Sequence, residues 1–100
     1  MKPNRQIDSR RQKSNEQALS KAFASLADPR SVQAFLKDIC TPAELQALAD
    51  RWQVALLLRE ELSYRAIHDQ TGVSVTTIGR VARYVSSGAG GYLSALQAIE

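Results

Sequence analysis

Apolar residues recur at helical spacing along most of the chain, and no stretch alternates apolar and polar residues at the period of two typical of a strand. Two amphipathic stripes come first, one predicting a helix over about residues 15–27 and one a short helix ending near Cys40. Asp28-Pro29 separates them, because the residue before proline disfavours helical backbone. The stripes consist of Leu19, Ala22, Phe23 and Leu26, then Val32, Phe35, Leu36 and Ile39. The pattern predicts an all-α fold with a helical pair over residues 15–40.

A third helix is expected in segment 41–62, where the strongest start signal of the chain occurs. Thr41-Pro42-Ala43-Glu44 offers an N-cap hydroxyl, a proline at the first helical position, and a glutamate that can bond back to the cap. Within this helix, Val54, Leu57 and Leu58 widen the apolar arc beyond one face. Such a helix needs cover on several sides, and in a chain of 100 residues we expect a second subunit to supply it.

Segment 63–85 has the pattern of a helix-turn-helix. Ser63 can cap a short helix that ends near Gln70, and Ser74 can cap a second helix after the turn. Gly72 lies where the chain must leave the first helix with a positive φ, which glycine adopts freely. We expect four apolar residues to pack inside the corner: Ile67, Val73, Ile78 and Val81.

The face of the second helix opposite Ile78 is polar and basic. At 100° per residue, Thr76, Arg80 and Arg83 gather there, and Gly79 and Tyr84 lie at its margins. A mid-helix glycine costs about 1 kcal/mol relative to alanine, which close approach of a backbone or a sugar-phosphate would explain. Thr76 and Thr77 suit base edges, and Arg65, Arg80 and Arg83 suit phosphates or guanine. The alternative is an ordinary solvated helix face.

The two ends of the chain differ in charge and composition. Residues 1–14 lack apolar periodicity and are predicted to form a flexible basic arm. Residues 1–15 carry five basic and one acidic side chain, a net charge of +4, so the other 85 residues carry a net charge of −1. Such an arm could bind the phosphates of a nucleic acid, or it could be an ordinary solvated tail. Residues 86–100 are a Gly-rich break and a short terminal helix, and segment 15–100 is expected to be one helical domain.

Several chemistries are disfavoured. One Cys and one His cannot supply a four-ligand zinc site, and one Cys cannot form an intrachain disulfide. The longest apolar run, residues 54–58, is far shorter than a membrane span or a signal-peptide core. Ser63, His68 and Asp69 make a poor catalytic relay, because adjacent helix positions point about 100° apart. We therefore expect a cytoplasmic protein that is neither an enzyme nor a metalloprotein, has no cofactor, and does not bind membranes.

Three segments resemble the Trp repressor superfamily, and within it the YerC/YecD branch of small bacterial proteins: TPAELQALADRW at 41–52, ELSYRAIHDQTGVSVTTIGRV at 61–81, and GGY at 90–92. The resemblance covers about half of the chain. It implies an all-α homodimer with intertwined protomers, whose two recognition helices meet successive major grooves of a near-palindromic operator.

The resemblance also implies functional positions. The family's DNA-contacting residues fall on Arg65, His68, Val75, Thr76, Thr77, Gly79 and Arg80, and its tryptophan pocket falls on Thr41, Arg51, Arg80, Val81 and Tyr84. Val81 and Tyr84 replace a glycine and a serine of the Trp repressor, and packed sites do not accept added volume cheaply. We therefore do not expect tryptophan to bind. Arg51 and Arg80 could hold another ligand or pair with carboxylates such as Asp50.

The sequence as a whole predicts a homodimeric DNA-binding regulator that acts as a repressor on double-stranded DNA, with an unknown small-molecule effector if there is one. Two alternatives stay open: a helix-turn-helix used for protein interaction, and a repressor that responds to a ligand other than tryptophan.

Overall fold

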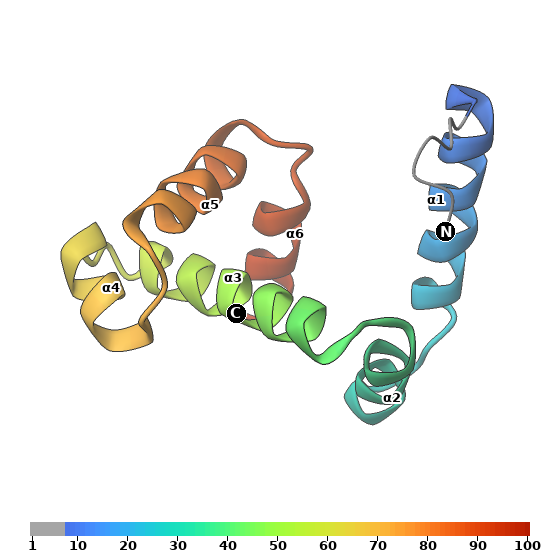
Figure 1. Cartoon of the computed structure of the whole chain (residues 1–100), viewed down its shortest axis with the longest axis horizontal. Helices are drawn as coiled ribbons and strands as arrows, with labels where there is room; N and C mark the ends of the chain where they lie inside the picture. The colour runs from blue at the N-terminus through green and yellow to red at the C-terminus, as the bar shows by residue number, and fades with distance from the viewer. Residues whose placement is uncertain (1–7) are drawn as a thin grey trace. The chain divides into compact units, whose positions relative to one another are not determined.

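The computed structural model describes residues 8–100, and these residues contain six α-helices and no strand (Figure 1). The helices are α1 (Ser9–Ala24), α2 (Pro29–Ile39), α3 (Pro42–Arg59), α4 (Tyr64–Thr71), α5 (Val75–Ser87) and α6 (Gly91–Ala98). The predicted all-α fold is confirmed. None of the helices in residues 8–100 is both long and apolar enough to cross a membrane.

The described chain falls into two compact units, and the first unit ends at Ile39. Its helix α1 begins at Ser9, so the expected arm over residues 1–14 is helical from residue 9 onward. The physical reason is a cap: the Asp8 carboxylate accepts a hydrogen bond from the Arg10 backbone N–H at 2.8 Å. Residues 1–7 of the expected arm lie outside the described residues.

The first unit is a helical pair without a buried residue of its own. Phe23 of α1 and Phe35 of α2 meet edge to face, with ring centroids 5.1 Å apart. The apolar stripes of both helices otherwise remain partly open, and Leu19 and Ile39 are 41% and 50% exposed.

In the second unit, residues 40–100, α3 is the longest helix and starts where the sequence predicts. The Glu44 N–H donates to Thr41 Oγ1 at 3.1 Å, and the Thr41 N–H donates to Glu44 Oε1 at 2.8 Å. This reciprocal pair completes the capping box, and it lowers the pKa of the Glu44 carboxyl because it favours the ionised form.

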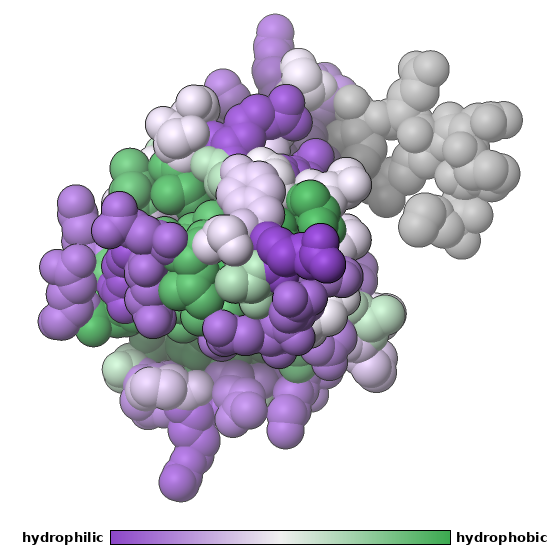
Figure 2. Space-filling model, turned by 90° about the vertical axis from the view of Figure 1, so that its left-hand side faces the viewer, coloured by the Kyte–Doolittle hydropathy of each residue, from purple (hydrophilic) through white to green (hydrophobic). Residues whose placement is uncertain are grey.

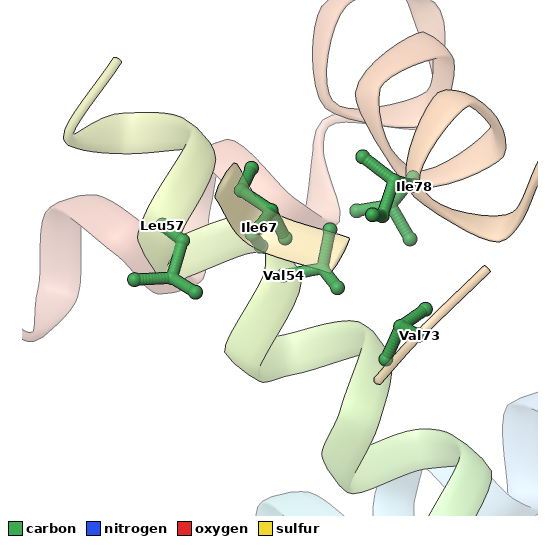
Figure 3. Close-up of a cluster of buried hydrophobic side chains, with 7 residues drawn as sticks. Val54, Leu57, Ile67, Val73 and Ile78 are labelled. Carbon is green, nitrogen blue, oxygen red and sulfur yellow. The ribbon is translucent and has the colours of Figure 1, made fainter. Parts of the chain in front are cut away.

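The core of this unit lies where α3, α4 and α5 meet (Figure 3). Val54 and Leu57 of α3, Ile67 of α4, Val73 of the turn and Ile78 of α5 all point into it. Val54, Ile67 and Ile78 are fully buried. The expectation that a second subunit covers the Val54–Leu58 arc is therefore wrong for Val54, Ala55 and Leu57, because α4 and α5 of the same chain bury them.

Helix α6 packs against α5, and the bend between them depends on glycine. A Cβ at Gly88 would collide with the backbone carbonyl of Tyr84, and Gly90 has a φ of 89°. The Arg59 guanidinium donates a hydrogen bond to the Leu96 carbonyl at 3.1 Å, which ties α6 to the end of α3. These contacts place α6 against α5 and near the end of α3.

Candidate nucleic-acid interface

Local hydrogen bonds set the geometry of the helix-turn-helix formed by α4 and α5. Ser63 Oγ accepts from the Ala66 N–H and Ser74 Oγ accepts from the Thr77 N–H, each at 3.1 Å, so both predicted caps are present. Gly72 has a φ of 75° and its N–H donates to the His68 carbonyl at 2.8 Å. The predicted turn glycine is therefore confirmed in its conformation.

The turn between these helices is tied at two further points. Thr71 Oγ1 donates to the Ile67 carbonyl at 2.7 Å and accepts from the Val73 N–H at 3.1 Å. The imidazole of His68 lies 2.7 Å from the Val73 carbonyl through Nδ1. Since a carbonyl only accepts, Nδ1 carries the proton in this bond and Nε2 stays available at the surface.

The outer face of α5, which we define as Val75, Thr76, Arg80 and Arg83, is open to solvent. All four side chains are exposed, and Val75 keeps 50% of its surface accessible. On the opposite side of the helix, Ile78 and Val81 are 0% and 2% exposed. Burial of those two residues holds α5 against the core and leaves the outer face free, as the sequence predicts.

Thr77 and Gly79 occupy the margin of this face and are half-buried. The Thr77 hydroxyl accepts a hydrogen bond at 3.0 Å from the Oγ of Ser74, the residue that caps α5. A Cβ built on Gly79 would meet only Tyr64 Cε2, at 3.9 Å, an ordinary van der Waals distance. No crowding within the chain therefore requires glycine here.

On α4, the two residues singled out for DNA contact, Arg65 and His68, are exposed. Tyr64, directly after the Ser63 cap, is 43% exposed, and its ring lies beside Gly79 of α5. On the side of the molecule where α4 lies, hydrophilic residues surround smaller apolar patches (Figure 2).

The charge of the second unit is unevenly distributed. Residues 40–100 contain five arginines and six acidic residues, yet α5 contains Arg80 and Arg83 and no acidic residue. Both guanidinium groups lie over the ring of Tyr84, at 5.1 Å and 5.6 Å from its centroid. The outer face of α5 is thus a cationic surface suited to phosphate groups.

A cavity of about 540 Å³ opens beside α5. It brings together four of the five expected pocket residues: Arg51, Arg80, Val81 and Tyr84. Thr41 does not line it and is engaged in the cap of α3. The sequence reasoning missed the remaining lining residues, Trp52, Ala89, Gly91, Tyr92 and Ala95, most of which come from α6 and the loop before it. Asp50, suggested as a partner for the arginines, accepts a hydrogen bond from Gln46 Nε2 at 2.8 Å.

Comparison with known proteins identifies the family of this chain. The family model described as Trp repressor protein matches residues 14–100. The chain belongs to the Trp repressor family. It is 40% identical over 95 residues to the uncharacterized protein YerC of Bacillus subtilis (strain 168), and the matched residues make up 95% of this chain and 90% of YerC.

A solved structure shares the architecture of this member of the Trp repressor family. It is the crystal structure of a TrpR-like protein from Eubacterium eligens ATCC 27750, with a TM-score of 0.77 and 37% identity over 87% of this chain and 89% of that one. The Trp repressor family is a family of regulatory, DNA-binding helix-turn-helix proteins.

Proposed function

We propose that the protein is a sequence-specific transcriptional repressor that binds a near-palindromic operator as a homodimer. The observation that carries the proposal is the outer face of α5: basic, free of acidic residues within the helix, and exposed while Ile78 and Val81 anchor the opposite side. A helix presented in this way fits the major groove of double-stranded DNA.

Within this proposal, the side chains divide between affinity and sequence choice. Arg65, Arg80 and Arg83 bind phosphates or guanine, and His68 presents Nε2 to the backbone. Thr76 and Thr77 contact base edges, Val75 contacts a thymine methyl group, and Gly79 allows close approach of the sugar-phosphate. Arg80 stands at the centre of this set, because it lies on the outer face and also lines the cavity.

The homodimer is supported by the open apolar stripes of α1 and α2. Neither helix has a buried residue, although Leu19, Phe23, Phe35 and Ile39 lie along their apolar sides. A second copy supplies cover of matching composition, and the Trp repressor family binds DNA as dimers. Light scattering of the purified chain should therefore give a mass of about twice 11.0 kDa. A monomer mass at micromolar concentration would contradict this part of the proposal.

The test of DNA binding is Arg80→Ala with Arg30→Ala as its control. Arg30 is an exposed arginine of α2, outside the helix-turn-helix, so both variants remove one positive charge. Hydrogen bonds to charged groups contribute about 1.5–3 kcal/mol, so Arg80→Ala should weaken duplex binding about 10- to 150-fold for each protomer of the dimer, without lowering the melting temperature. The slope of log K against the logarithm of salt concentration should become shallower by about 0.9 for each phosphate that Arg80 neutralises.

Arg30→Ala should leave the duplex affinity and its salt dependence nearly unchanged. Equal binding by Arg80→Ala and the wild type, or binding by the wild type that ignores salt, would refute the proposal. In that case the helix-turn-helix would serve protein interaction, and a partner would be retained when Thr76 and Arg80 are replaced.

A ligand-responsive repressor is the second candidate, and the cavity favours it. Arg51 and Arg80 both line this cavity. Val81 and Tyr84 also line it, and each is larger than the glycine or serine that the Trp repressor has at that position, so they leave less room for an indole. L-Tryptophan at millimolar concentration should therefore not raise the melting temperature. A clear upward shift would show that the volume argument is wrong and that tryptophan is an effector.

A further inference from the structure

Tyr84 lies next to both arginines of the outer face. The guanidinium of Arg80, four residues earlier, lies 5.1 Å from the centroid of its ring, and that of Arg83 lies 5.6 Å from it. Both distances fall within the range in which a cation is attracted to the face of an aromatic ring. One ring therefore contacts two positive charges on the same helix.

Packing of the core does not explain this tyrosine. Its side chain is 43% exposed, whereas the residues that hold α5 in place, Ile78 and Val81, are buried. Among the hydrogen bonds of residues 8–100, none involves the Tyr84 hydroxyl. Its clearest interactions are those with the two arginines.

We propose that Tyr84 is a positioning residue for DNA binding, whose ring holds the guanidinium groups of Arg80 and Arg83 in place on the outer face before a duplex arrives. This inference rests on the proposed function and extends it to a residue with no direct contact to DNA. The ring acts through the two arginines.

The ring can favour DNA binding in two ways: it orders the two arginine side chains in advance, and it offsets the repulsion between their charges. Arginine has a long side chain, and fixing it on binding costs conformational entropy that a preorganised side chain has already lost. Arg80 and Arg83 are also like charges three residues apart on one helix, an arrangement that is unfavourable without compensation. An aromatic face offers that compensation and leaves the in-plane N–H donors of each guanidinium free for phosphate oxygens.

The experiment compares Tyr84→Leu with Tyr84→Phe in duplex-binding titrations. Phenylalanine keeps the aromatic face and removes the hydroxyl, whereas leucine keeps an apolar side chain and removes the ring. Tyr84→Leu should bind duplex DNA about three- to tenfold more weakly than the wild type, and Tyr84→Phe should stay within about twofold of it. If Tyr84→Phe loses as much affinity as Tyr84→Leu, the hydroxyl contacts DNA directly and the positioning role is overturned.

A double-mutant cycle separates positioning from a general effect on the fold. In a background of Arg80→Ala and Arg83→Ala, the further change Tyr84→Leu should alter affinity less than about twofold, because nothing remains to be positioned. The same three- to tenfold loss in both backgrounds would overturn the proposal. Circular dichroism melts of each variant show whether α5 has remained folded.

A readout without DNA distinguishes the failure of this inference from that of the proposed function. In the ¹H–¹⁵N spectrum of the free protein, the side-chain Nε–H resonances of Arg80 and Arg83 should be displaced by the ring, and Tyr84→Leu should move them toward unperturbed positions. Unchanged resonances would overturn the positioning role by themselves. A wild type that does not bind duplex DNA would instead refute the proposed function, whatever these resonances show.

Discussion

Replacing Gly79 with alanine should change stability and DNA binding in opposite directions. Gly79 lies inside α5, where glycine is about 1 kcal/mol less favourable than alanine. The added Cβ would meet only Tyr64 Cε2 at 3.9 Å, so no steric cost offsets this gain. For a domain of this size, a gain of 1 kcal/mol raises the melting temperature by about 4–8 °C. The variant should therefore be more stable than the wild type.

The same methyl group should weaken binding to a duplex. If Gly79 allows close approach of the sugar-phosphate, the added carbon overfills a packed interface, which costs about 1–3 kcal/mol. That cost corresponds to about a 5- to 150-fold loss of affinity. The assays are thermal unfolding at fixed protein concentration and fluorescence anisotropy with a labelled duplex.

Gly91→Ala is the matched control. Gly91 begins α6, has no positive φ, and has open space where a Cβ would lie. This variant should unfold at the same or a higher temperature and bind DNA like the wild type. If Gly79→Ala gains stability and keeps its DNA affinity, Gly79 is not a point of close approach to DNA. If Gly79→Ala loses stability, the account of the packing around Tyr64 is wrong.

Three further predictions concern the fold. Ile78→Ala removes a fully buried side chain and should destabilise the protein by about 2–5 kcal/mol in urea unfolding; a smaller loss would show that the corner is loosely packed. Thr41→Ala removes the cap of α3 and should cost about 0.5–2 kcal/mol in the same assay, and an unchanged midpoint would refute the role of the cap. The pKa of Glu44 is lowered in the fold, so its contribution to stability is complete above the ordinary value of 4.5 and is lost as the pH falls through the folded-state pKa. Melting temperatures of Glu44→Gln and the wild type should therefore converge on acidification, and a constant difference would contradict this.

Helix boundaries fixed by local chemistry were predictable from the sequence. The caps at Thr41, Ser63 and Ser74 and the positive φ of Gly72 depend on residues within a few positions of one another. The start of α1 was not predicted, because residues 9–14 contain no apolar stripe and the only signal is the short side chain of Asp8.

Contacts between segments that are far apart in the sequence were harder to predict. The wide apolar arc of α3 around Val54 predicts that other helices must bury it. The pattern does not say whether those helices belong to the same chain or to a second one. The outward direction of Arg80 and Arg83 follows from helical spacing alone. Their contact with the ring of Tyr84 depends on side-chain conformation, and the contribution of Tyr92 to the cavity depends on how α6 packs, neither of which the pattern encodes.

Selection of duplexes from a random DNA library tests most directly whether the outer face of α5 reads DNA. The wild type should enrich a near-palindromic sequence with half-sites about one helical turn apart. A variant with Thr76, Arg80 and Arg83 all replaced by alanine should enrich no motif and yet melt at a temperature close to that of the wild type. Enrichment of the same motif by both proteins, or of none by the wild type, would contradict the account.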